Sequence, residues 1–139
     1  MFIREVIFVV SNLKNSIEFY SVIFGDALNK SRSRAEFRSG LVLCTEKYWR
    51  NKIGLSDDSI YDFSLSSTVV FDCDEFFQTI VNILEHGYIQ HIINVDSDSV
   101  TVVDDDFNVL IIRTSGKDQA VIDNIHVAEI VESAMSVRS

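Results

Sequence analysis

The chain has 139 residues, and 47% of them are hydrophobic, which is enough for the core of one compact domain or of two small modules that share a core. Its net charge of −9 argues against nucleic acid as a partner, because phosphate binding needs clustered positive charge. The first apolar run, Val6 to Val10, follows Arg4 and Glu5 and is too short for a signal peptide or a membrane span. We therefore expect a soluble, cytoplasmic protein with no membrane partner.

The first half of the chain predicts a strand, a helix and further strands. Residues 2–10 are mostly β-branched or aromatic, which favours a buried strand. An amphipathic helix follows, capped by Ser11 or Asn12 and ended by Gly25. Its apolar residues recur at spacings of three and four: Leu13, Ile17, Tyr20 and Phe24. Residues 27–39 and 41–46 are strand-like, with a hinge at Gly40 between them. From 48 to 64 the pattern of apolar residues weakens.

The same order then recurs about 62 residues later, with Gly87 in the place of Gly25. A strand at 67–73 leads through a capping Asp74 to an apolar helical pattern at 76–84, and strands follow at 88–95, 99–103 and 109–114. The predicted fold class is α+β, with a βαβββ module at about 1–54 and another at about 66–114. We expect them to pair into a cupped mixed sheet with a small-molecule groove, as a single domain spanning 1–115. A helical tail at 116–139 packs either on the body or on a partner subunit.

The segment Val6 to Leu28 resembles the opening of the glyoxalase / bleomycin-resistance / extradiol-dioxygenase superfamily, which has the vicinal oxygen chelate fold. The matching motifs are Asn12-Leu13, Phe19-Tyr20 and Phe24-Gly25, and VVFDCDEFF resembles the corresponding part of a second module. The resemblance covers residues 1 to about 114. It implies paired βαβββ modules, a cupped cavity and a homodimer.

Metal-dependent members of that superfamily use up to four ligand positions, two from each module. By resemblance, these positions correspond to Glu5, Leu43, Thr68 (or Ser67 after a slip of one residue) and Ile111. A divalent ion needs about three His, Glu or Asp ligands, and this set offers Glu5 alone. We therefore expect no metal and no cofactor, as in a metal-free, bleomycin-resistance-like branch.

Other candidate ligand residues are predicted to be structural. The cysteines, Cys44 and Cys73, lie in strand-like runs and read as reduced core thiols. The scattered histidines show no zinc spacing, and we expect structural or surface roles for them: His86, His91 and His126. The run of aspartates at 104–106 reads as a solvated turn, because Phe107 directly follows it and calcium loops need alternating ligands around a glycine.

The segment from Lys30 to Lys52 carries seven cationic residues and two glutamates, a charge of +5 that leaves −14 for the rest of the chain. Strand alternation predicts one charged face: Lys30, Arg32, Arg34, Glu36 and Arg38. This face is either a solvated edge or part of the cup, where Arg34 and Arg38 would grip an anion. Tyr48 and Trp49 either form an aromatic wall over a ligand or pack in the core or a loop.

The sequence therefore favours a non-catalytic small-molecule-binding protein, in a resistance or sequestration role. The residues that we expect to bind the ligand are Glu5, Arg34, Arg38, Tyr48, Trp49 and Ile111. One alternative is a metal-independent enzyme of the same fold that uses Glu5 as a general base. Another is a regulatory or assembly module that makes contact through its C-terminal helix.

Overall fold

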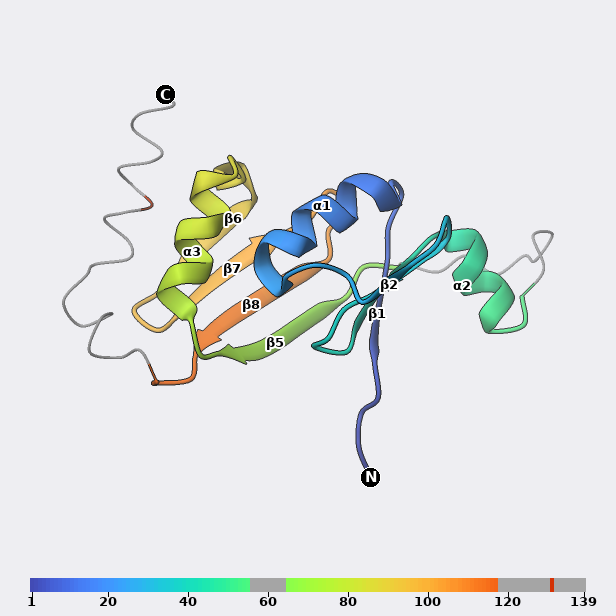
Figure 1. Cartoon of the computed structure of the whole chain (residues 1–139), viewed down its shortest axis with the longest axis horizontal. Helices are drawn as coiled ribbons and strands as arrows, with labels where there is room; N and C mark the ends of the chain where they lie inside the picture. The colour runs from blue at the N-terminus through green and yellow to red at the C-terminus, as the bar shows by residue number, and fades with distance from the viewer. Residues whose placement is uncertain (56–64, 118–130, 132–139) are drawn as a thin grey trace. The chain divides into compact units, whose positions relative to one another are not determined.

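The computed structural model of the chain describes residues 1–55, 65–117 and 131 (Figure 1). The chain divides into two compact units. Unit 1 contains Met1–Ser67 and the short segment Asp105–Asn108, and unit 2 contains Thr68–Asp104 and Val109–Ser139. The segment at 105–108 therefore belongs to unit 1, although the strands on both sides of it along the chain belong to unit 2.

Unit 1 has one four-stranded sheet in the order β1-β4-β3-β2, in which β1 runs parallel to β4 and the other pairs are antiparallel. Its elements are β1 (Val6–Val9), α1 (Leu13–Phe24), β2 (Asn29–Lys30), β3 (Arg34–Glu36), β4 (Leu41–Cys44) and α2 (Glu46–Lys52). The predicted first module is confirmed. The helix α2 was not predicted, and it begins where Thr45 accepts a hydrogen bond from the backbone N–H of Tyr48 at 3.3 Å.

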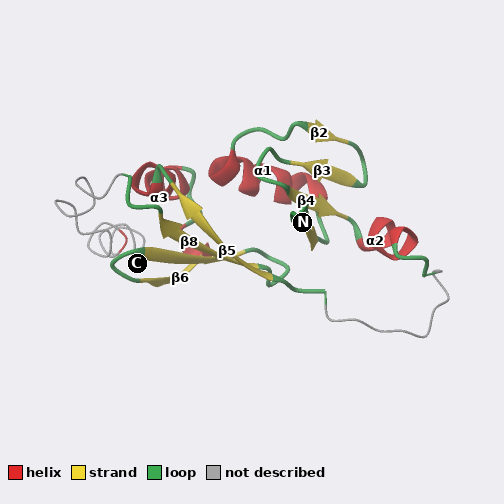
Figure 2. Ribbon diagram, turned by 90° about the horizontal axis from the view of Figure 1, so that it is seen from below, coloured by secondary structure: helices red, strands yellow, loops and turns green. Residues whose placement is uncertain are grey.

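Unit 2 repeats this topology with the order β5-β8-β7-β6, in which β5 runs parallel to β8. Figure 2 shows the helix α3 and the strands β5, β6 and β8 of this unit from below. Its elements are β5 (Thr68–Cys73), α3 (Phe76–Glu85), a 3₁₀ turn (Ile89–His91), β6 (Ile92–Val95), β7 (Ser99–Val103) and β8 (Val109–Thr114). The 3₁₀ turn replaces the first half of the strand predicted at 88–95. The second βαβββ module is confirmed, and with it the α+β fold class.

The helix α1 begins and ends where the sequence predicts. The side chain of Asn12 accepts a hydrogen bond from the backbone N–H of Asn15 at 3.1 Å, and Gly25 ends the helix at a φ of 79°. A positive φ of this kind favours glycine. The ring of Tyr20 packs against Phe8 of β1, with centroids 5.8 Å apart. The helix α1 therefore covers one face of the sheet of unit 1.

The start of α3 differs from the prediction. Its N-terminal cap is Glu75, without a capping side-chain hydrogen bond, and Asp74 instead pairs with Lys117 at 3.0 Å. A hydrogen bond with Ser115, and then Lys117, lower the pKa of this exposed carboxyl. The prediction of Asp74 as the cap is wrong, because partners from the end of β8 compete for its carboxylate.

The predicted C-terminal helix lies outside the described residues, apart from Val131, whose side chain is buried. His126 and residues 56–64 also lie outside them. No helix in the described ranges is long and apolar enough to cross a membrane.

Candidate functional site

The strand register of unit 1 determines which side chains share the sheet face opposite α1. Phe8, Leu43 and Ala35 lie side by side on β1, β4 and β3, and all three are buried on the α1 side. Because side chains alternate along a strand, the opposite face carries the next residues in each register. These residues are Ile7 and Val9 of β1, Val42 and Cys44 of β4, and Arg34 and Glu36 of β3.

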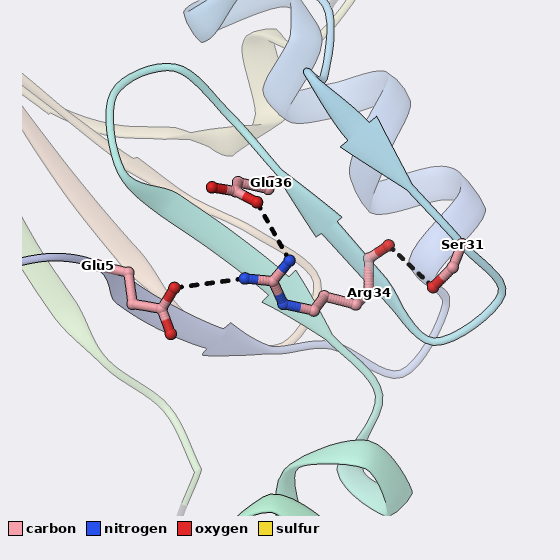
Figure 3. A network of polar contacts seen from close by, with 4 residues as sticks. All are labelled: Glu5, Ser31, Arg34 and Glu36. Atoms are coloured by element: carbon pink, nitrogen blue, oxygen red, sulfur yellow. Dashed lines mark hydrogen bonds and ion pairs between the residues drawn. The ribbon is translucent and has the colours of Figure 1, made fainter.

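A charged group lies on this face, where Arg34 contacts two carboxylates (Figure 3). One terminal nitrogen of Arg34 lies 3.3 Å from Oε2 of Glu5, and the other lies 3.2 Å from Oε2 of Glu36. The side chains of Arg34 and Glu5 are 24% and 25% exposed. We call these three residues the Arg34 group, which carries one net negative charge.

Burial disfavours the charged guanidinium of Arg34 and so lowers its pKa, but interactions with neighbouring side chains outweigh this lowering. The hydrogen bond to Glu36 and the charges of Tyr48, Glu36 and Glu5 together raise the pKa of Arg34. The sequence had offered Glu5 as a lone carboxylate and Arg34 as a free anion-binding group. This ion pair does not favour the binding of an anion by Arg34, since both terminal nitrogens of the guanidinium already contact carboxylates.

The predicted charged face extends less far than alternation suggested. The backbone N–H of Ser31 donates to the carbonyl of Arg34 at 2.8 Å, which closes a turn between β2 and β3. In the antiparallel register Lys30 pairs with Ala35, so it lies on the α1 side rather than on the side of Arg34. Assigning Lys30 to the face of Arg34 was wrong, because the turn interrupts the alternation.

The other predicted ligand residues of unit 1 are not part of the Arg34 group. Arg38 is exposed in the turn after β3, and it takes part in none of the ion pairs found among the described residues. Tyr48 and Trp49 are half-buried on α2.

The positions that resemble metal ligands do not fit a divalent ion. Leu43 lies on the α1 side, and Val42 and Cys44 face the side of Arg34 instead. In unit 2, Ile111 pairs with Val70, while Thr68 pairs with Val109. Across the described ranges, no three His, Cys, Asp or Glu side chains form a group that could hold a metal ion.

The prediction of a solvated turn at 104–106 is confirmed for Asp105, which is exposed in the turn, but it is wrong for Asp104. Asp104 is buried, and the carboxylate of Asp106 accepts a hydrogen bond from the backbone N–H of Ser11 at 3.1 Å. Phe107 has a φ of 64°, a region that bulky side chains rarely adopt, and its ring is 76% exposed. Strained positions of this kind cluster at functional sites.

Two of the histidines have structural contacts. The Nδ1 atom of His86 lies 2.8 Å from the carbonyl of Asn82, at the end of α3. The Nδ1 atom of His91 lies 2.7 Å from the carbonyl of Val103, and His91 belongs to the 3₁₀ turn rather than to a strand. Both contacts agree with the expected structural roles.

A cleft of about 270 Å³ lies in unit 1 beside the end of β1. We call it the acidic cleft, because it is lined by two carboxylates and four apolar side chains, with two serines: Glu46, Asp106, Val9, Val10, Leu65, Phe107, Ser11 and Ser66. Among the residues that the structure describes, no lysine or arginine lines it. Its carboxylates are Glu46 of α2 and Asp106 of the segment at 105–108, and the sequence assigned neither residue to a site.

The thiol of Cys44 gives a pH-dependent prediction. Burial raises the pKa of Cys44 from 9.0 to about 11. In an unfolded chain the Cys44 thiol would lose its proton near pH 9, whereas in the folded chain the thiol keeps its proton at that pH. Stability therefore falls between pH 9 and pH 11, by at most about 1.4 kcal/mol per pH unit. Urea unfolding at several pH values should show this decline in the wild type. The Cys44→Ala variant should lack the part of the decline that comes from the thiol. Equal slopes in both proteins would contradict the assignment.

Comparison with known proteins supports the fold. No model of a known family matches the chain, and no curated protein matches it either. Among solved structures, a lactoylglutathione lyase from Agrobacterium tumefaciens is similar, with a TM-score of 0.58 at 17% identity, over 82% of this chain and 93% of that one. A glyoxalase/bleomycin resistance protein from Albidiferax ferrireducens T118 has a TM-score of 0.53 at 15% identity, over 81% of this chain and 97% of that one.

A third similar structure is TnmS3, an antibiotic binding protein from Streptomyces sp. CB03234, with a TM-score of 0.51 at 14% identity, over 82% of this chain and 95% of that one. The chain thus has the vicinal oxygen chelate fold of the glyoxalase/bleomycin-resistance superfamily, as the resemblance implied.

Proposed function

We propose that this protein binds a small organic molecule without a metal, in a resistance or sequestration role, and that the ligand carries a positive charge. The acidic cleft supports the proposal most strongly. Apolar side chains and two carboxylates line it. Glu46 also forms an ion pair with Arg50 of α2 at 3.2 Å, and Asp106 accepts a hydrogen bond from Ser11. Such a site favours an organic cation, because apolar walls give affinity and a few polar groups give specificity.

Phe107 adds a second reason for a cationic ligand. Its exposed ring belongs to the lining of the acidic cleft. An aromatic face attracts a cation by about 0.5 to 2 kcal/mol, depending on how far the pair is removed from water. The positive φ of Phe107 holds this ring in a backbone conformation that has an energetic cost, as is common for residues that meet a ligand.

The general-base alternative is less well supported. Glu5 would have to remove a proton from a substrate, but Arg34 holds its carboxylate at 3.3 Å. The similarity to a lactoylglutathione lyase concerns the fold and carries no residue of that enzyme over to this chain. The similarity to an antibiotic binding protein agrees with the binding proposal.

A homodimer remains part of the proposal. The apolar residues Met1, Phe2 and Ile3 precede β1 and are fully or almost fully exposed. Clustered exposed apolar residues commonly mark interaction sites. Sedimentation of the samples used for binding would test the dimer, and a monomer at every concentration would refute it.

The binding proposal is tested with benzamidine as a cationic probe, compared with neutral benzamide and anionic benzoate. Benzamidine should bind best, and the Glu46→Gln/Asp106→Asn variant should bind it at least about tenfold more weakly, a loss of about 1.4 kcal/mol. Asparagine at 106 can still accept the hydrogen bond of Ser11. The control Asp105→Asn/Glu85→Gln removes the same charge from exposed positions outside the cleft. An equal loss in both variants would refute the acidic cleft as the site.

A further inference from the structure

A second cleft, of about 340 Å³, lies on the α1 side of unit 1, where no function has been proposed. We call it the basic cleft. Four of its lining residues belong to α1 and three to β2 and the turn that follows: Leu13, Lys14, Ile17, Glu18, Lys30, Ser31 and Arg32. Because Lys30 pairs with Ala35, it lies on the face opposite the Arg34 group.

The basic cleft has an excess of positive charge. Lys14, Lys30 and Arg32 face a single carboxylate, that of Glu18. All three cations are exposed, and none of them takes part in an ion pair with another described residue. Three cations around one opening repel one another, and a bound anion would relieve this repulsion. The positive charge is local, since the whole chain carries −9.

The floor of the basic cleft is apolar. The side chain of Leu13 is 8% exposed, and Ile17 is half-buried one turn further along α1. A ligand that fills the cleft would therefore bury an apolar group against α1 while its charge meets the cations at the rim. The volume is near the lower end of the usual range for small-molecule sites.

Hydrogen bonds hold the turn that carries two of these cations. The backbone N–H of Ser31 donates to the carbonyl of Arg34 at 2.8 Å, and that of Thr45 donates to the carbonyl of Ser33 at 3.0 Å. The turn is thus fixed to both β3 and the end of β4. A fixed backbone reduces the entropy that a ligand loses on binding, since less of the site has to be ordered.

We propose that the basic cleft binds an amphipathic organic anion, a carboxylate or phosphate ester with a short apolar or aromatic group. This site is separate from the acidic cleft and takes a ligand of opposite charge. Arg32 and Lys30 supply the charge contacts from the turn side, and Lys14 supplies them from α1.

The test is a titration of ¹⁵N-labelled full-length protein with phenyl phosphate, followed by amide chemical shifts. Phenylacetate distinguishes a carboxylate from a phosphate ligand, and inorganic phosphate tests the need for an apolar group. Shifts should be largest at the amides of Ile17, Ser31 and Arg32. Phenyl phosphate or phenylacetate should bind at least about tenfold more tightly than inorganic phosphate, and raised salt should weaken binding.

The Lys30→Gln/Arg32→Gln variant should weaken binding of the organic anion by at least about tenfold. The matched control, Lys47→Gln/Lys52→Gln, removes two exposed charges from α2 and should bind as the wild type does. An equal loss in both variants would show an effect of overall charge and overturn the proposal. The absence of shifts at the basic cleft, or binding of inorganic phosphate as tight as that of the organic anions, would overturn it as well.

Discussion

Replacing Asn108 by alanine is expected to lower the free energy of unfolding by about 3 kcal/mol. The side chain of Asn108 is fully buried and bonds at both ends. Its Oδ1 accepts from the backbone N–H of Ser67 at 3.0 Å, and its Nδ2 donates to the carbonyl of Val9 at 3.2 Å. Alanine would leave both backbone groups without these bonds, and each unsatisfied buried group costs about 1 to 3 kcal/mol.

Urea unfolding followed by circular dichroism measures this loss. The control is Asp105→Ala, three residues earlier and exposed, which should change stability by no more than about 0.5 kcal/mol. If Asn108→Ala were as mild as the control, the hydrogen bonds of the segment at 105–108 would not stabilise unit 1 as described.

Replacing Arg34 by methionine is expected to cost about 1.5 kcal/mol, between the values typical of exposed and of buried ion pairs. The change leaves Glu5 and Glu36 without the cation that they share at 3.3 and 3.2 Å. Glu36 is 39% exposed, so water screens its charge and limits the loss. Methionine keeps most of the apolar stem of arginine, which isolates the effect of the charge.

The rescue variant distinguishes charge from packing. Adding Glu5→Gln and Glu36→Gln to Arg34→Met removes both unpaired carboxylates and should recover more than half of the lost stability, as measured by the same urea unfolding. If the triple variant were no more stable than Arg34→Met alone, the loss would come from packing, and the Arg34 group would have no electrostatic role in stability.

The sequence predicts the modules of this fold well, because the signals for them are local. Asn12 and Gly25 define the ends of α1 through short-range hydrogen bonds and backbone preference. The apolar runs define β7 and β8 at the predicted residues. The helix α2 was missed, because its seven residues have no buried side chain and therefore no apolar periodicity.

The candidate site was predicted only in part, because it depends on contacts between distant segments. Glu5 and Arg34 were both named, but a separation of 29 residues hid their ion pair. Asp106 reaches Ser11 across 95 residues, so no local pattern could assign it to a cleft beside β1. The turn at Ser31 reverses the chain and moves Lys30 to the other face, which alternation alone could not reveal.

The central claim is that unit 1 binds an organic cation in the acidic cleft without a metal. The most direct measurement is the dissociation constant of benzamidine for the wild-type protein, determined once with a chelator present and once after addition of zinc or nickel. We predict the same dissociation constant under both conditions within about twofold, a difference of roughly 0.4 kcal/mol. Binding that requires the metal, or benzoate that binds as tightly as benzamidine, would contradict it.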